Sequence, residues 1–171
     1  TQAPQAARIL GEFSSRYPDP QSVIQENREV VESLLMGLGL HHRARRILDL
    51  CRVLVDRHDG QVPRTAKELS ALPGVGPYTT NAVLCFAFGQ DVAIVDQNVV
   101  RVLTRIFRPS IRSARPRDDS GLWSLASSLL PIGLTRDYHF GLLDFAAAVC
   151  TPKTTHQGCP MVEFCQHLLD A

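Results

Sequence analysis

The stretch Leu72-Pro73-Gly74-Val75-Gly76-Pro77-Tyr78-Thr79 decides the fold of this chain. Gly74 and Gly76 can adopt positive φ and let the main chain approach a ligand closely. Pro77 suits the first turn of a helix, where its missing N–H costs nothing. Because apolar segments lie on both sides, the pattern predicts a helix, a glycine hairpin and a second helix. The N–H groups that start the second helix would face an anion, as in a clamp on backbone phosphate. An ordinary turn between two helices is the alternative.

A carboxylate follows at the start of a further predicted helix, in Val95-Asp96-Gln97-Asn98. Asp96 precedes an apolar run and can cap that helix, with Val95 and Val100 forming a hydrophobic staple. The same carboxylate can also face a substrate from the helix entrance. A structural cap and a catalytic group are therefore both compatible with Asp96.

Length and composition indicate an ordinary globular protein. The chain has 171 residues, 44% hydrophobic and 20% charged, which suffices for one domain or two small lobes with a buried core. No apolar run is long enough to span a membrane. Helical periodicity dominates, as at Ile47, Leu50 and Leu54, and the strand-like run 92–95 is too short for a sheet. The sequence predicts an all-α fold.

The cysteines point to an intracellular, reducing compartment. There are five, three of them near the C-terminus, which favours metal ligation over a disulfide framework. Cys51 and Cys85 fall within apolar helices and are predicted to lie in the core.

Local charge is more informative than the formal net charge of +1. The segment 97–117 contains arginines and no acidic residue, and a second basic cluster occupies 41–46. Such runs often form solvated helix faces. Two of them around a phosphate-clamp hairpin are also what a duplex-binding surface needs, because neutralising phosphates supplies most non-specific affinity.

Together these elements resemble the helix-hairpin-helix DNA glycosylases of the endonuclease III and MutY type, from residue 1 to about Cys165. The resemblance is strongest to the branch of MutY-type adenine glycosylases and thymine glycosylases that act on T·G mismatches. Besides the two motifs above, it rests on Gly37-Leu38-Gly39, Arg43-Ala44-Arg45, Val99-Val100-Arg101-Val102-Leu103, Leu122-Trp123 and Asp144-Phe145.

The resemblance implies two helical lobes flanking a DNA-binding cleft. Residues 1–91 correspond to most of a six-helix lobe that carries the hairpin. Residues 92–171 correspond to a second lobe with the catalytic aspartate and a metal-cluster loop. In the family a further N-terminal segment precedes the position of Thr1 and joins the second lobe.

The resemblance also implies the reaction. The family's catalytic aspartate matches Asp96, whose carboxylate would stabilise oxocarbenium character at the sugar C1′ and orient water. Family members that also cut the strand carry a lysine at position 78, whose amine attacks C1′. This chain has Tyr78 there, and its lysines are Lys67 and Lys153. The resemblance therefore implies base excision without strand cleavage, with Tyr78 lining the pocket of the flipped base. The alternative for Tyr78 is a residue that only packs in the wall of the cleft.

Several residues are expected to contact DNA. Leu40 is the candidate wedge that fills the gap left by a flipped base, although a loop leucine packed on the core has the same pattern. The expected contacts to DNA come from Leu40, His41, Arg43, Gly74, Val75, Gly76, Thr79, Asn98 and Arg101.

The C-terminal cysteines depart from the family pattern. The family holds a [4Fe–4S] cluster with Cys-x6-Cys-x2-Cys-x5-Cys, whereas this chain reads Cys-x5-His-x2-Cys-x5-Cys, with ligand candidates Cys150, His156, Cys159 and Cys165. Three alternatives stay open: a Cys3His iron–sulfur cluster, a Cys3His zinc site, or a lost cluster with spare thiols.

The sequence as a whole predicts a monofunctional DNA glycosylase of base excision repair. The expected substrate is thymine or uracil opposite guanine, flipped out of double-stranded DNA by a monomeric enzyme in the cytoplasm or nucleoid. A MutY-type adenine glycosylase acting opposite guanine or 8-oxoguanine is one alternative. A non-catalytic DNA-binding module that uses the hairpin and arginines is another.

Overall fold

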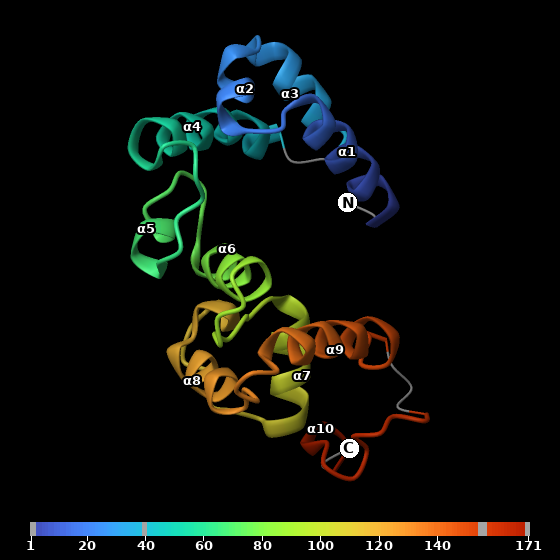
Figure 1. Ribbon diagram of the computed structural model, residues 1–171. Helices are drawn as coiled ribbons and strands as arrows, with labels where there is room; N and C mark the ends of the chain where they lie inside the picture. The colour runs from blue at the N-terminus through green and yellow to red at the C-terminus, as the bar shows by residue number, and fades with distance from the viewer. Residues whose placement is uncertain (1–2, 39–40, 154–156, 170–171) are drawn as a thin grey trace. The chain divides into compact units, whose positions relative to one another are not determined.

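The computed structural model describes residues 3–38, 41–153 and 157–169, without the side chains at 3, 41–44 and 169. All regular structure in these residues is helical, which confirms the predicted all-α class (Figure 1). Within the same residues, no helix has the length and apolarity needed to cross a membrane. The contacts form two compact units, Thr1–Gly76 and Pro77–Ala171.

The first unit is built around its longest helix, α4. Its elements are α1 (Ala3–Arg16), α2 (Pro20–Gln25), α3 (Arg28–Met36), α4 (His41–His58) and α5 (Ala66–Ser70). Both α2 and α3 pack against α4. The shared core consists of Ile9, Tyr17, Val23, Val31, Leu35, Leu48 and Cys51. Cys51 is buried in this core, which confirms its predicted position, and the burial raises the pKa of its thiol to about 11.

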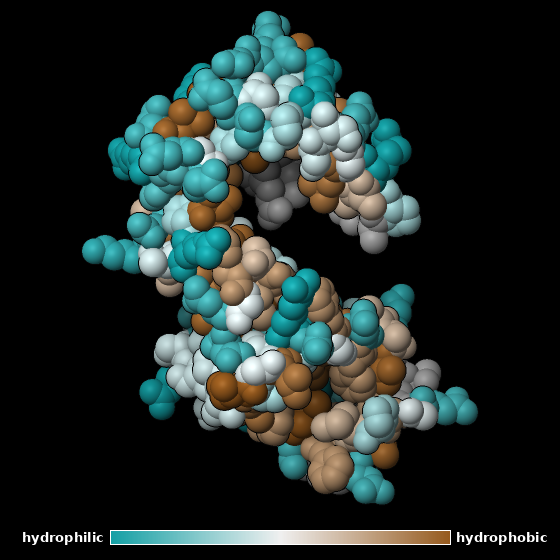
Figure 2. Space-filling view, in the orientation of Figure 1, coloured by the Kyte–Doolittle hydropathy of each residue, from teal (hydrophilic) through white to brown (hydrophobic). Residues whose placement is uncertain are grey.

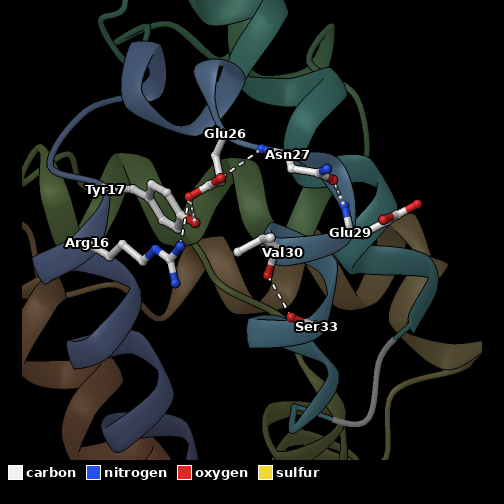
Figure 3. A network of polar contacts seen from close by, with 7 residues as sticks. All are labelled: Arg16, Tyr17, Glu26, Asn27, Glu29, Val30 and Ser33. Atoms are coloured by element: carbon white, nitrogen blue, oxygen red, sulfur yellow. Dashed lines mark hydrogen bonds and ion pairs between the residues drawn. The ribbon is translucent and has the colours of Figure 1, made fainter.

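A polar corner joins the first three helices (Figure 3). Glu26 Oε2 accepts hydrogen bonds from Arg16 Nη2 at 2.8 Å and from the Tyr17 hydroxyl at 3.2 Å. Glu26 Oε1 accepts the Asn27 N–H at 2.9 Å, and Asn27 in turn caps α3 by accepting the Glu29 N–H at 2.9 Å. The N–H of Asn27 and the Arg16 guanidinium lower the pKa of Glu26. The carboxylate therefore fixes the ends of α1 and α2 against the start of α3.

The second unit surrounds α7. Its elements are α6 (Pro77–Ala82), a π-helix (Val83–Ala87), α7 (Gln97–Phe107), a 3-10 turn (Pro116–Asp118), α8 (Ser120–Ser128), α9 (Thr135–Ala148) and α10 (Gln166–Leu169). One side of α7 packs through Val99 and Leu103 against Leu122 of α8. Another side packs through Val102 and Ile106 against the end of α9. Burial on two sides fixes the start of α7, where Asp96 lies.

Along the chain, the boundary between the two compact units falls after Gly76, earlier than the lobe boundary predicted near residue 91. The segment 77–91 belongs to the second unit because its side chains bind there. Asn81 Nδ2 donates to the Ala93 carbonyl at 2.7 Å, and the Phe86 and Phe140 rings stack with centroids 4.7 Å apart. The lobe boundary near residue 91 stays a prediction.

Apolar side chains also reach the surface. Figure 2 shows large apolar areas over the second unit, where the exposed members are Phe107, Ile132, Leu134, Phe140, Val162 and Phe164. Cys85 of the same unit is fully buried, which confirms its predicted core position.

Candidate active site

The predicted helix, glycine hairpin and helix are present, as α5, the turn 71–76 and α6. The turn closes with a hydrogen bond from the Val75 N–H to the Leu72 carbonyl at 3.2 Å. Gly74 has φ +78°, which L residues rarely adopt, and a Cβ there would lie 3.2 Å from Arg46 Cδ. Gly76 lacks positive φ, and a Cβ there would meet nothing within 4 Å. Gly74 thus shapes the turn, whereas Gly76 leaves its outer side open.

The contact at Gly74 adds Arg46 to the candidate site. The stem of this exposed α4 side chain runs along the hairpin backbone. The sequence shows Arg46 in a basic cluster but does not show its contact with Gly74, because the two residues are far apart in the chain. An exposed arginine whose stem packs on the hairpin backbone suits a surface that binds phosphate.

Tyr78 is the second residue of α6 and is 44% exposed. Thr79 beside it is also exposed. The helix continues directly into the π-helix 83–87. An aromatic side chain at this place can contact a base or sugar without supplying an amine.

Asp96 is the N-cap of α7, as predicted. Its Oδ1 accepts the Val99 N–H at 2.8 Å, and its Oδ2 accepts Asn98 Nδ2 at 2.9 Å. Val95 and Val100 lie in one apolar cluster, as the predicted staple requires. The half-buried carboxylate is therefore held through both oxygens at the helix entrance, and the cap is compatible with a catalytic role.

A relay of hydrogen bonds continues from Asp96 into the unit. Asn98 Oδ1 accepts Arg101 Nη2 at 3.1 Å, which orients the Asn98 amide so that its NH2 faces Asp96. Arg101 also donates to the carbonyls of Ala146 at 2.9 Å and Cys150 at 2.7 Å. Asn98 and Arg101, both predicted to contact DNA, thus make contacts inside the protein that orient Asp96.

Some of the remaining arginines in the segment 97–117 bind other groups of the protein. Arg105 donates to the carbonyls of Thr151 at 2.8 Å and Pro152 at 3.3 Å. Arg115 pairs with Asp118 at 2.9 Å. Part of the basic run therefore stabilises the second unit.

The cysteine loop is only partly within the described residues. Cys150 Sγ accepts Arg105 Nη1 at 3.4 Å, and the Cys165 thiol donates to the Arg105 carbonyl at 3.6 Å. Cys159 is half-buried, and His156 lies outside the described residues. Among those that are described, no three His, Cys, Asp or Glu side chains come together as a metal site. The described cysteines alone do not assemble a ligand set.

A family model described as HhH-GPD superfamily base excision DNA repair protein matches residues 1–118. The chain belongs to this superfamily. A thymine/uracil-DNA glycosylase of Methanothermobacter thermautotrophicus is 36% identical over 98% of the chain and 76% of its own length. Another, from Pyrobaculum aerophilum, is 38% identical over 90% of the chain and 68% of its own length. The adenine DNA glycosylase of Homo sapiens is 33% identical over 96% of the chain and 31% of its own length.

Solved structures of HhH-GPD proteins agree with this assignment. A thermostable thymine-DNA glycosylase superposes with a TM-score of 0.92 at 34% identity, covering 100% of this chain and 79% of that one. An endonuclease III trapped as a covalent intermediate with DNA gives a TM-score of 0.87 at 27% identity, over 99% and 78% of the two chains. The resemblance and the assignment to base excision repair are confirmed.

Three side chains of this HhH-GPD chain that were predicted to contact DNA lie outside the part of the chain that the structure describes. Leu40 lies outside the described residues, as do the side chains of His41 and Arg43 in the first turn of α4. The wedge role of Leu40 therefore stays a prediction.

Proposed function

We propose that the chain is a monofunctional DNA glycosylase that excises thymine or uracil opposite guanine from double-stranded DNA. The carboxylate of Asp96, held through both oxygens at the start of α7, is the observation that carries the proposal. The enzyme acts as a monomer inside the cell. The names of the thymine/uracil-DNA glycosylase relatives support the choice of base.

The chemistry requires one well-placed negative charge. Breaking the N-glycosidic bond develops positive charge at C1′, which Asp96 stabilises electrostatically. Its carboxylate also orients the water that attacks C1′ and accepts a proton from it. The base must first leave the helical stack, because C1′ is shielded within a duplex. Asn98 and Arg101 keep the carboxylate in one orientation throughout.

Tyr78 makes the reaction purely hydrolytic. Strand cleavage through a Schiff base needs an amine at C1′, and α6 contains no lysine. Lys67 lies in α5 and Lys153 follows α9. Hydrolysis therefore leaves an abasic site and an intact strand.

Excision of adenine is the second candidate function, and the adenine DNA glycosylase relatives favour it. Single-lesion duplexes with T·G, U·G, A·G and A·8-oxoguanine distinguish the two after hot alkali, which breaks the strand at abasic sites. Cleavage of T·G and U·G alone supports the proposal. Cleavage of the adenine duplexes alone replaces it, and tight binding without any cleavage indicates a DNA-binding module.

The hairpin is proposed as the phosphate clamp, and Gly76→Leu tests it. Because a Cβ at Gly76 would meet nothing within 4 Å, we expect the fold to be unaffected while the approach of phosphate is blocked. Charge-assisted backbone hydrogen bonds contribute about 1.5–3 kcal/mol each, so we expect duplex affinity to fall about tenfold or more. Gly11→Leu in α1, also with open space, is the control. Equal affinity of both variants, measured by fluorescence anisotropy, would rule out the clamp.

We also propose that Cys150, His156, Cys159 and Cys165 hold a [4Fe–4S] cluster. The spacing of the last three ligands, which matches the family pattern, supports this. Purified protein is then expected to be yellow-brown with broad absorbance near ~400 nm. Colourless protein with stoichiometric zinc would indicate a zinc site instead, and colourless protein without metal would indicate a lost cluster.

A further inference from the structure

The segment 91–95 leads directly into Asp96 and has neither helical nor strand structure. Its last three residues are nevertheless almost completely buried, each at 3% exposure or less. Backbone polar groups in such a place need partners inside the protein. One comes from α6, where Asn81 Nδ2 donates to the Ala93 carbonyl at 2.7 Å.

The second partner comes from α9. His139 Nε2 lies 3.2 Å from the Ile94 nitrogen and 3.1 Å from the Val92 carbonyl oxygen. The ring is 2% exposed and packs edge-on against Phe86 of the π-helix and against its neighbour Tyr138. The imidazole therefore has little freedom to move away from the segment.

The neutral state of His139 suits its contacts with the segment. Burial lowers its pKa, so the ring is neutral near pH 7. A neutral imidazole has one acceptor nitrogen and one N–H. With the hydrogen on Nδ1, Nε2 accepts the Ile94 N–H; with the hydrogen on Nε2, it donates to the Val92 carbonyl. Either tautomer binds the ring to the segment, while the buried Nδ1 has no partner of its own.

We propose that Asn81 and His139 are positioning residues that clamp the segment 91–95 and thereby place the Asp96 carboxylate for base excision. The inference rests on the proposed function. Neither side chain contacts Asp96; both act through the backbone that precedes it. The segment has no helix or strand hydrogen bonds of its own. Asp91 accepts the Gly133 N–H at 3.1 Å and the Val92 N–H donates to the Gln90 carbonyl at 3.0 Å. Asn81 and His139 anchor the buried part that follows, next to Asp96. A displacement of the reacting group by about 1 Å can lower a rate about 10²-fold.

The test uses variants that separate the hydrogen bond from the bulk of the ring. His139→Leu keeps an apolar side chain but removes the acceptor. His139→Gln is the conservative rescue, because its amide reaches about as far as Nε2 and offers both an acceptor and a donor. Asn81→Ala removes the second anchor. Ile106→Ala, in the core below α9, is the control for loss of stability alone.

Two measurements are made on each folded variant. Single-turnover excision with saturating enzyme gives the chemical rate, and titration of the duplex gives its Kd. We expect His139→Leu and Asn81→Ala each to lower the rate about tenfold or more with an unchanged Kd. His139→Gln should retain the rate within about threefold. Since both anchors hold one segment, the double variant should lose less than the product of the single losses.

A third measurement, by NMR, does not depend on activity. The Val99 N–H binds the Asp96 carboxylate, so its NMR signal and hydrogen exchange report where that carboxylate lies. His139→Leu should shift this signal and speed its exchange, whereas His139→Gln and Ile106→Ala should not.

The outcomes separate this inference from the proposed function. If the parent protein excises no base from any of the duplexes, the proposed function is contradicted. The NMR signal of the Val99 amide in His139→Leu then still decides whether the clamp exists. If the parent is active, a His139→Leu rate no lower than that of Ile106→Ala overturns the clamp. An undisturbed Val99 amide in His139→Leu, or failure of His139→Gln to restore the rate, overturns it as well.

Discussion

Replacing Asp96 by asparagine is expected to lower the excision rate about 10²-fold or more while leaving the fold and duplex binding nearly intact. The loss corresponds to about 3 kcal/mol of transition-state stabilisation, the scale found when one preorganised electrostatic group is removed. Asparagine keeps the oxygen that accepts the Val99 N–H, and it is among the best N-cap residues. The negative charge facing C1′ is what disappears.

The relay gives this variant a second, smaller signature. The new amide would face Asn98 Nδ2, which now donates to Asp96. If the Asn98 amide rotates, it presents its NH2 to the Arg101 guanidinium, so one hydrogen bond is lost either way. We expect the free energy of unfolding to fall by about 1 kcal/mol, measured by urea denaturation.

A matched control is available in the same unit. Asp137 is an exposed acidic residue in the first turn of α9, and Asp137→Asn makes the same change of charge on a residue that does not cap α7. This variant should excise at the parent rate. An equal loss in both variants would point to a general effect of charge on DNA binding.

Tyr78→Lys is expected to add a reaction that the parent lacks. A lysine at the second position of α6 would attack C1′ and form a Schiff base, which borohydride reduces to a stable protein–DNA adduct. Denaturing gel electrophoresis of labelled duplex should show this adduct for the variant and none for the parent. An endonuclease III of similar fold has been trapped covalently on DNA.

Two further variants make the gain of function specific. Tyr78→Phe should form no covalent adduct, and its excision rate should fall by no more than a few fold, since only a hydroxyl is removed. Ala87→Lys places an amine on an exposed residue further along the same helical segment, and it should form no covalent adduct with DNA. Adduct formation by the parent would contradict the monofunctional assignment, and absence of adduct from Tyr78→Lys would place position 78 away from C1′.

Local signals in the sequence predicted the local structure well. The glycine hairpin follows from Gly74 and Pro77, and the cap follows from an aspartate before an apolar run at Val99 and Val100. Both depend on residues within a few positions of each other. The sequence could not show that only Gly74 needs positive φ, because two glycines in one turn look equivalent.

Contacts between distant segments were beyond sequence reasoning. Arg101 lies in a basic run and was predicted to contact DNA, which stays a prediction; the sequence could not show that its guanidinium also binds the carbonyls of Ala146 and Cys150. His139 had no signal at all, since one histidine in a helix does not reveal that its ring is buried against the segment before Asp96. Such roles depend on which helices pack together, here α7 and α9.

The central claim is that the Asp96 carboxylate carries base excision. Its most direct test is single-turnover excision of a T·G duplex by the parent and Asp96→Asn, both at saturating enzyme. The parent should convert the duplex to an alkali-labile abasic product, and Asp96→Asn should do so about 10²-fold more slowly with an equal Kd. Equal rates for the two proteins would reduce Asp96 to a helix cap and contradict the mechanism.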